Sequence, residues 1–227
     1  MMTLVKSKLK TFIGGIHPED DGKLLTKGKK EVSSPLPKTV YLFMSQHIGA
    51  PCKPIVKKGD TVKKGQLVGE AQGFVSVNVH SSISGKVVDV VPWPHPITGI
   101  KSPAVIVERT EDDSWIEGAN EDFDTDLISP EEIKQRIQSA GIVGLGGATF
   151  PTHVKLTPPK DKVIDTVVMN GAECEPYLTC DYRLMLDKPH EIIQGLKFVM
   201  KCLGCKNAHI GIEVNKEDVY TLFKDIL

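Results

Sequence analysis

A change of pattern near Trp115 divides the chain into two parts. Between residues 39 and 108, short runs of alternating apolar and polar residues are separated by glycine and proline turns such as Gly59-Asp60. This pattern is typical of short β-strands in a small barrel or sandwich. After Trp115, helical periodicity alternates with short apolar runs, which is typical of an α/β layer fold. We therefore predict two domains, residues 1–118 and 119–227, joined at the acidic stretch "EGANEDFDTD".

Composition excludes several classes of protein. The 227 residues hold 28 Lys+Arg and 29 Asp+Glu, a net charge of -1, which gives no overall attraction to nucleic acid. No apolar run reaches the roughly 18 residues that a membrane-spanning helix needs. The 5 cysteines are too sparse for a secreted disulfide scaffold. We expect a cytoplasmic protein that binds no nucleic acid and reaches a membrane only through a partner.

The β-rich half is similar to a known fold. Its stretches "VKKGDTVKKGQLVGE" and "VNVHSSISGKVVDVV" resemble the barrel-sandwich fold of biotinyl and lipoyl carriers. Such carriers present a lysine on the hairpin between their two halves. The matching stretch "AQGFVSVNVH" contains no lysine, so a carrier function lacks its attachment point.

Five elements are expected in the second half. Ser129 and Pro130 begin a helix that Gly141 ends, with Glu132 completing a capping box. "DKVIDTVVMN" is interpreted as a buried strand, "HEIIQGLKFVMKCLG" as an amphipathic helix and "AHIGIEV" as a further strand. Asn215 is expected to cap a last helix whose pattern is still running at Leu227, so the C-terminus looks cut.

The densest glycine run is "GIVGLGGATFP" at residues 141–151, followed by Lys155. Glycine lets backbone approach a phosphate or a flat ring closely, and a lysine nearby adds positive charge. The run lacks the Gly-Lys-Ser/Thr of a P-loop and does not follow a strand as a dinucleotide fingerprint does. Taken alone, it is better explained by a tight turn needed for helix packing.

An acidic turn follows the predicted strand "TVVMN". Asn170 ends that strand, and open α/β sheets bind ligands at the carboxyl ends of their strands. Glu173 and Glu175 lie two residues apart and would point to the same side of an extended backbone. Paired acids accept hydrogen bonds from ribose hydroxyls, although two glutamates also occur commonly in solvated loops.

A metal site is not predicted. Cys202 and Cys205 form a CxxC pair without further ligands at suitable spacing, and we assign them to packing at a helix end. The seven histidines lack the i, i+4 spacing of a helical zinc site.

Four ordered motifs extend over most of the chain. They are "GGIHP" (14–18), "SQHIGAPCKPIVKKGDTVKKGQ" (45–66), "AGIVGLGGATFPTHVKL" (140–156) and "MNGAECEPYLTCDYRLM" (169–185). Together they resemble the RnfC family, the C subunits of Rnf electron-transport complexes. The last two are also similar to the flavin-binding subunit of respiratory complex I, whose corresponding stretches have the form GRGGAGFPTGLKW and NADExEPG.

This resemblance implies an FMN and NADH site in the second domain. Glu173 and Glu175 are the residues expected to act in catalysis, and Phe150 is expected to hold the dinucleotide. Leu145 and Ala172 depart from the complex I pattern, which has arginine and aspartate there, so the charge around the ligand differs. The cofactor-binding residues implied are Gly144, Gly146, Gly147, Ala148, Phe150, Lys155, Asn170, Glu173 and Glu175.

The resemblance also implies a reaction. Hydride would pass between the nicotinamide C4 of NAD(H) and N5 of FMN, and electrons would pass to or from [4Fe-4S] clusters and ferredoxin, coupled to ion movement by other subunits. The tandem cysteine runs that bind such clusters are absent, and they are expected in a C-terminal region outside this sequence. We expect the isolated chain to be inactive, and located on the inner face of the cell membrane through partner subunits. The alternative is a non-catalytic assembly module of the same complex.

Overall fold

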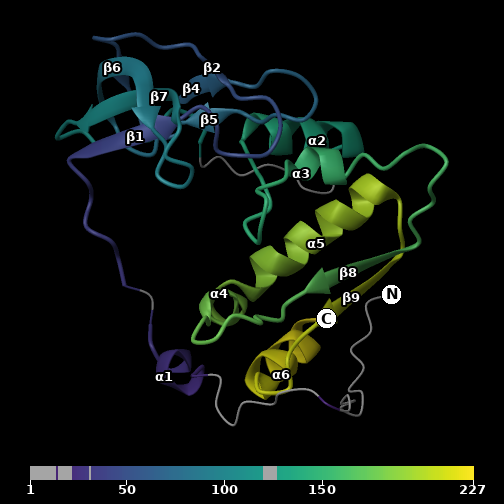
Figure 1. The fold of residues 1–227 in the computed structure, drawn as a ribbon. Helices are drawn as coiled ribbons and strands as arrows, with labels where there is room; N and C mark the ends of the chain where they lie inside the picture. Colours follow the sequence, from purple (N-terminus) through teal and green to yellow (C-terminus); the bar gives the residue numbers. More distant parts are fainter. Residues whose placement is uncertain (1–13, 15–21, 31, 120–126) are drawn as a thin grey trace. The chain divides into compact units, whose positions relative to one another are not determined.

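The computed structural model describes residues 14, 22–30, 32–119 and 127–227 (Figure 1). The chain forms two compact units. The β unit comprises Pro35–Pro159, and the α/β unit comprises the chain up to Ser34 together with Lys160–Leu227. Most of the GGIHP motif and of the predicted acidic linker lies outside the described residues.

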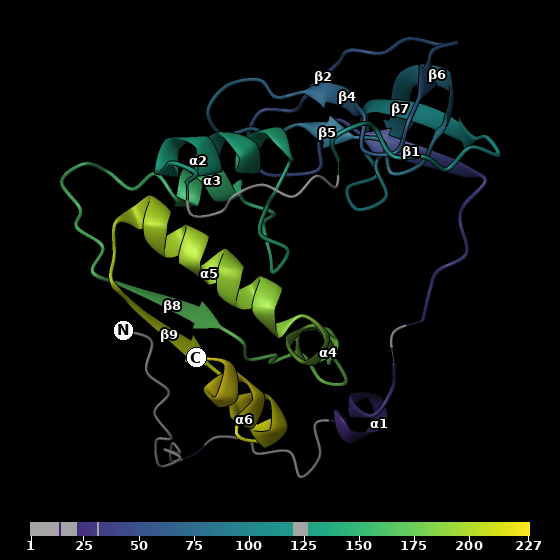
Figure 2. The same cartoon turned by 180° about the vertical axis from the view of Figure 1, so that it is seen from behind.

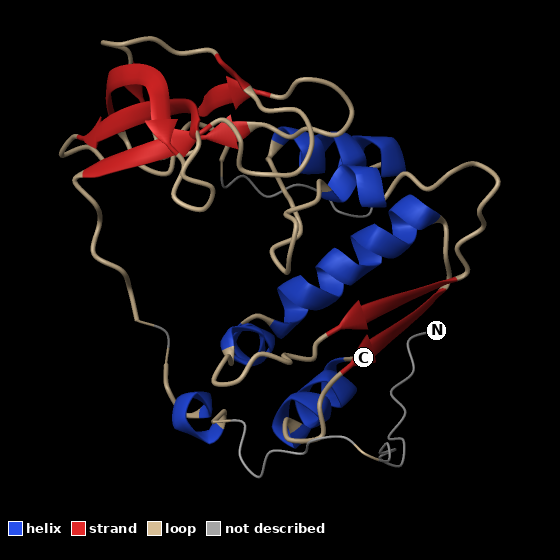
Figure 3. Cartoon of the chain, viewed as in Figure 1, coloured by secondary structure: helices blue, strands red, loops and turns tan. Residues whose placement is uncertain are grey.

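Antiparallel strands build the β unit, coloured red in Figure 3. One sheet has the order β1-β7-β6-β3 and the other has the order β2-β4-β5. The strands are β1 (Thr39–Phe43), β2 (Lys53–Pro54), β3 (Thr61–Val62), β4 (Leu67–Glu70), β5 (Val79–His80), β6 (Gly85–Pro94) and β7 (Lys101–Arg109).

A hydrophobic core fills the β unit. Met44, Val68, Val87, Val105 and Val107 have no exposed surface. Because successive residues of a strand point to opposite faces, alternate apolar residues collect on the inner face of each sheet. The core therefore follows the alternation seen in the sequence.

A helical segment completes the β unit. Helix α2 (Pro130–Ser139) begins as predicted, with the Ser129 hydroxyl accepting a hydrogen bond from the amide of Glu132 at 3.2 Å. Short helix α3 (Thr152–Lys155) follows the glycine run. The predicted boundary at residue 118 stays a prediction. By contacts, however, the described residues from 127 to 159 group with the strands.

Contacts with the loop between β4 and β5 explain this grouping. The Asn78 side chain donates to the Ser139 carbonyl at 3.2 Å, and the Gln138 side chain donates to the Ser76 carbonyl at 3.4 Å. His153 Nε2 lies 2.7 Å from the Phe74 carbonyl. Both helices are therefore fixed to residues 71–80, the stretch that matches the lysine-bearing hairpin of carrier proteins.

The α/β unit is a strand–helix–strand arrangement with further helices. Strands β8 and β9 are parallel, and α5 connects them through the crossover expected of a βαβ unit. Figures 1 and 2 both show α5 lying along these strands. The elements are α1 (Leu24–Lys27), β8 (Thr166–Asn170), α4 (Cys180–Asp187), α5 (Pro189–Leu203), β9 (Asn207–Gly211) and α6 (Glu217–Ile226).

Two details of the α/β unit differ from expectation. Strand β8 is not buried, because Val168 is 70% exposed. Helix α5 contacts β8, and because strand residues alternate between faces, side chains that point away from this helix can lie in solvent. Helix α6 has Lys216 rather than Asn215 at its N-cap, and Lys216 makes no side-chain cap. Its ammonium is instead held in the buried ion cluster described below.

Within the described ranges, no helix has the length and apolar character needed to cross a bilayer.

Candidate functional site

The glycine-rich segment folds into a closed loop. An antiparallel bridge joins Val143 to Pro151, and the amide of Gly144 donates to the carbonyl of Phe150 at 3.0 Å. Thr152 then donates its amide to the Ile142 carbonyl at 3.1 Å. The bridge and these two hydrogen bonds close the base of the loop. Gly146 and Gly147 lie in the part of the loop beyond the bridge.

Bare backbone and one ammonium group meet on this loop. A Cβ added to Gly144 would lie 2.3 Å from Nζ of Lys155, so the lysine crosses directly over the glycine. A Cβ added to Gly146 or Gly147 would have no neighbour within 4 Å. The loop therefore offers open backbone beside a positive charge, which fits the phosphate and flat ring of FMN. Ala148 is exposed beside these glycines, and Phe150 is half-buried.

The acidic turn is anchored to the end of β8. The Asn170 side chain accepts a hydrogen bond from the amide of Ala172 at 3.0 Å, and the amide of Gly171 donates to the Gly211 carbonyl at 2.8 Å. A side chain at residue 171 would meet both that carbonyl oxygen and Met185, so glycine is required there. The turn therefore leaves the strand in a fixed direction.

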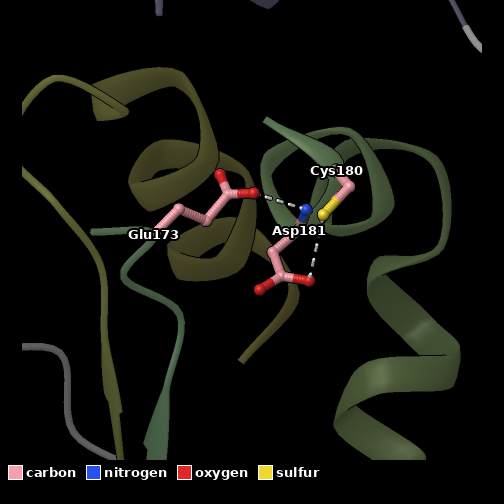
Figure 4. A group of neighbouring side chains, drawn as sticks. All are labelled: Glu173, Cys180 and Asp181. Atoms are coloured by element: carbon pink, nitrogen blue, oxygen red, sulfur yellow. Dashed lines mark hydrogen bonds between the residues drawn. The ribbon is translucent and has the colours of Figure 1, made fainter. Parts of the chain in front are cut away.

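Glu173 and Glu175 are in different environments. Glu173 is only 4% exposed, and its carboxylate accepts a hydrogen bond from the amide of Asp181 at 2.7 Å (Figure 4). It also accepts one from the amide of Tyr182 at 3.2 Å. It therefore caps the first turn of α4. Glu175 is exposed. Of the pair, Glu175 has its carboxylate accessible to a ligand.

A buried ion cluster surrounds Glu173. Lys216 Nζ lies 2.6 Å from Glu173 and 2.7 Å from Glu213. Burial alone would raise the pKa of Glu173, but hydrogen bonds from Lys216 and from the Asp181 amide outweigh it and lower the pKa. Burial likewise acts to lower the pKa of Lys216, and its hydrogen bonds to the two carboxylates raise it instead. Glu173 and Lys216 are therefore both charged at neutral pH.

Glu173, Cys180 and Asp181 bring potential metal ligands within 4.8 Å of one another (Figure 4). The Glu173 oxygens already accept from two amides and from Lys216. Burial and the neighbouring Asp181 carboxylate raise the pKa of the Cys180 thiol, which keeps it protonated and a poor ligand. Helix capping explains this cluster, and the expectation of no metal stays a prediction.

The N-terminal segment holds the acidic turn, which sequence reasoning missed. Lys23 is 5% exposed and donates to the carbonyls of Glu175 at 3.0 Å and Leu178 at 2.9 Å. Thr26 donates its hydroxyl to the Tyr177 carbonyl at 2.7 Å. These partners lie about 150 residues apart in sequence, and only the nearby GGIHP motif marked this segment.

The predicted site residues thus form two groups. The loop group is Gly144, Gly146, Gly147, Ala148, Phe150 and Lys155, in the β unit. The turn group is Asn170, Glu173 and Glu175, in the α/β unit. The structure brings together the members of each group.

Comparisons with known proteins define the class. Residues 10–112 match the family model of the RnfC barrel sandwich hybrid domain, and residues 137–227 match that of the Nuo51 FMN-binding domain. Both groups of site residues lie in the second match. The chain is therefore a two-domain protein that joins a barrel-sandwich hybrid domain to a domain of the Nuo51 FMN-binding type, as the sequence predicted.

Similar proteins specify the family. The chain is 49% identical over 208 residues to the C subunit of the proton-translocating ferredoxin:NAD(+) oxidoreductase complex of Clostridium ljungdahlii. It is 51% identical over 218 residues to the C subunit of the Na(+)-translocating complex of Acetobacterium woodii. It is 41% identical over 204 residues to the C subunit of the ion-translocating oxidoreductase complex of Rhodobacter capsulatus. The chain belongs to the RnfC family.

The alignments cover most of this chain and less than half of each relative. They include 92%, 92% and 89% of this chain, but 45%, 46% and 39% of the three relatives.

Proposed function

We propose that this chain is the FMN- and NAD(H)-binding part of an ion-translocating ferredoxin:NAD oxidoreductase. The observation that carries the proposal is the closed glycine loop, where open backbone at Gly146 and Gly147 lies beside Lys155 over Gly144. The match to an FMN-binding domain, which includes this loop and the acidic turn, supports the same function.

The loop group would bind FMN. Gly146, Gly147 and Ala148 would offer backbone amides to the cofactor, and the space beside Gly146 and Gly147 is uncrowded. Gly144 makes room for Lys155, which would add the charge that attracts the phosphate. Phe150 would help to hold the dinucleotide by contact with its rings.

The turn group would bind and orient NAD(H). Glu175 and Asn170 would accept hydrogen bonds from ribose hydroxyls or the nicotinamide amide. Glu173 would act through the turn, because its carboxylate is enclosed by α4 and Lys216. When bound, FMN supplies the chemistry that exchanges hydride with nicotinamide and single electrons with iron–sulfur clusters.

The remaining parts of the reaction would lie outside these residues. We place the [4Fe-4S] clusters in sequence beyond residue 227, and ferredoxin as the partner of those clusters. Other subunits would move the ion and hold the protein on the inner face of the cell membrane. The alternative, an assembly module without catalysis, makes the same partner contacts but needs no cofactor.

A carrier function is not supported. The stretch from Ala71 to His80 contains no lysine. His153 of α3 lies 2.7 Å from the Phe74 carbonyl within that stretch, so helical structure occupies the region where a carrier exposes its attachment residue.

The test is FMN titration followed by quenching of flavin fluorescence. Lys155→Ala is expected to weaken FMN binding roughly tenfold to a hundredfold, because it removes a charge-assisted contact. Lys160→Ala is the matched control: it removes another exposed lysine, outside the loop, and should leave affinity unchanged.

Two results would contradict the proposal. One is equal affinity for FMN in the wild type and Lys155→Ala. The other is failure of both this chain and the chain extended past Leu227 to bind FMN, which would favour the assembly module.

A further inference from the structure

Tyr177 has an unusual backbone conformation. It is a non-glycine residue with φ of 65°, in the left-handed region that glycine adopts most readily. The complex I form NADExEPG has glycine at this position. A side chain here is therefore strained, and such strain persists only where the surrounding structure imposes it.

The N-terminal segment imposes this conformation. Thr26 donates its hydroxyl to the Tyr177 carbonyl at 2.7 Å. Lys23 donates to the carbonyl of Glu175, two residues before Tyr177, at 3.0 Å and to that of Leu178, the next residue, at 2.9 Å. The Lys23 residue is buried, so these bonds are shielded from water. The turn is fixed at three carbonyls around one strained residue.

The Tyr177 ring rests on glycine, and the residue is largely exposed. A Cβ added to Gly22 would lie 2.2 Å from Cε1 and 2.3 Å from Cδ1 of Tyr177, so the ring lies against the bare backbone of Gly22. The residue is nevertheless 60% exposed. An exposed aromatic ring that is supported by neighbouring backbone is a surface on which a planar ligand ring can stack.

We propose that Tyr177 stacks against a planar heteroaromatic ring of NAD(H), and that Gly22 and Lys23 position it. This inference rests on the proposed function and assigns one further contact to it. Tyr177 lies two residues after Glu175, the accessible carboxylate of the turn, so one bound dinucleotide could reach both side chains. Because the ring is held before ligand arrives, little conformational entropy is lost on binding.

The experiment is titration of the full chain with NADH and, separately, with FMN by isothermal calorimetry. The variants are Tyr177→Phe, Tyr177→Leu and Tyr177→Gly. Phe keeps the ring, Leu keeps apolar bulk without a π-face, and Gly also relieves the positive φ. Tyr41→Leu, which removes another exposed tyrosine in the β unit, is the matched control.

The expected result separates the two ligands. Tyr177→Leu and Tyr177→Gly should weaken NADH binding roughly fivefold to tenfold. The NADH affinity of Tyr177→Phe should stay within about twofold of that of the wild type. FMN affinity should be unchanged in all three variants, and Tyr41→Leu should change neither affinity. Gly22→Ala, whose Cβ would displace the ring, should weaken NADH binding as Leu does.

Other outcomes overturn the inference. If the wild type binds FMN and NADH, and Tyr177→Leu and Tyr177→Gly bind NADH as tightly as the wild type does, the stacking proposal is wrong. The proposed function then stands. If Phe weakens NADH binding as much as Leu does, the hydroxyl rather than the ring makes the contact. If the wild type binds neither ligand, the proposed function itself fails and the inference fails with it.

Discussion

The Glu173 carboxylate connects three segments of the α/β unit. It lies in the turn after β8, accepts two amides at the start of α4, and pairs with Lys216 just before α6. Buried ion pairs often contribute little net stability compared with apolar replacements, but removal of one partner leaves an uncompensated charge. Glu173 therefore fixes the geometry of the turn.

Lys216→Met is expected to reduce the free energy of unfolding by about 3 kcal/mol, because it leaves Glu173 and Glu213 as neighbouring unpaired carboxylates. Urea unfolding measures this loss. Lys134→Met is the matched control, since it breaks only a surface pair with Glu131 and should cost under about 1 kcal/mol. A loss from Lys216→Met no larger than that of the control would contradict the assigned role.

The same variant makes a prediction about pH. The pKa of Glu173 is lowered from 4.5 in the folded protein, so its contribution to stability is complete above about that pH and is lost as pH falls through the lowered value. Lys216→Met removes a cause of the lowering. The fall in stability below about pH 4.5 should therefore be shallower in this variant than in the wild type.

Helix α5 contains a glycine with no packing role. Gly195 is exposed within the helix, and a Cβ there would have no neighbour within 4 Å. Gly195→Ala should raise stability by roughly 0.5–1 kcal/mol, because alanine loses less backbone entropy in a helix. Thermal unfolding measures the change. A decrease in stability would show that α5 is packed more tightly at this position than described.

At the scale of elements, local signals were predictable and burial was not. The start of α2 follows from Ser129 and Pro130, and the end of α5 from Gly204, whose φ of 67° is left-handed. The exposure of Val168 depends on how many layers cover β8, which periodicity does not specify.

The candidate site shows the same division. The loop and the turn were recognisable from motifs, because glycines and acids at fixed spacing are local features. The burial of Glu173 depends on Lys216, 43 residues further on, and the position of Tyr177 depends on Thr26, 151 residues before it. Such partners are set by tertiary contacts that no local pattern encodes.

At the scale of the whole molecule, the chain joins a β unit and an α/β unit and spans less than half the length of the three relatives compared. Each unit contributes one group of candidate residues. The central claim is that the glycines and Lys155 of the loop group bind FMN and that the turn group binds NAD(H).

Hydrogen exchange with FMN alone, with NADH alone and without ligand tests this claim most directly. The account predicts that FMN slows amide exchange in 144–155 and that NADH slows it in 170–178, while the core strand β7 is unchanged by either. Failure of FMN to protect the loop, or of NADH to protect the turn, would contradict it.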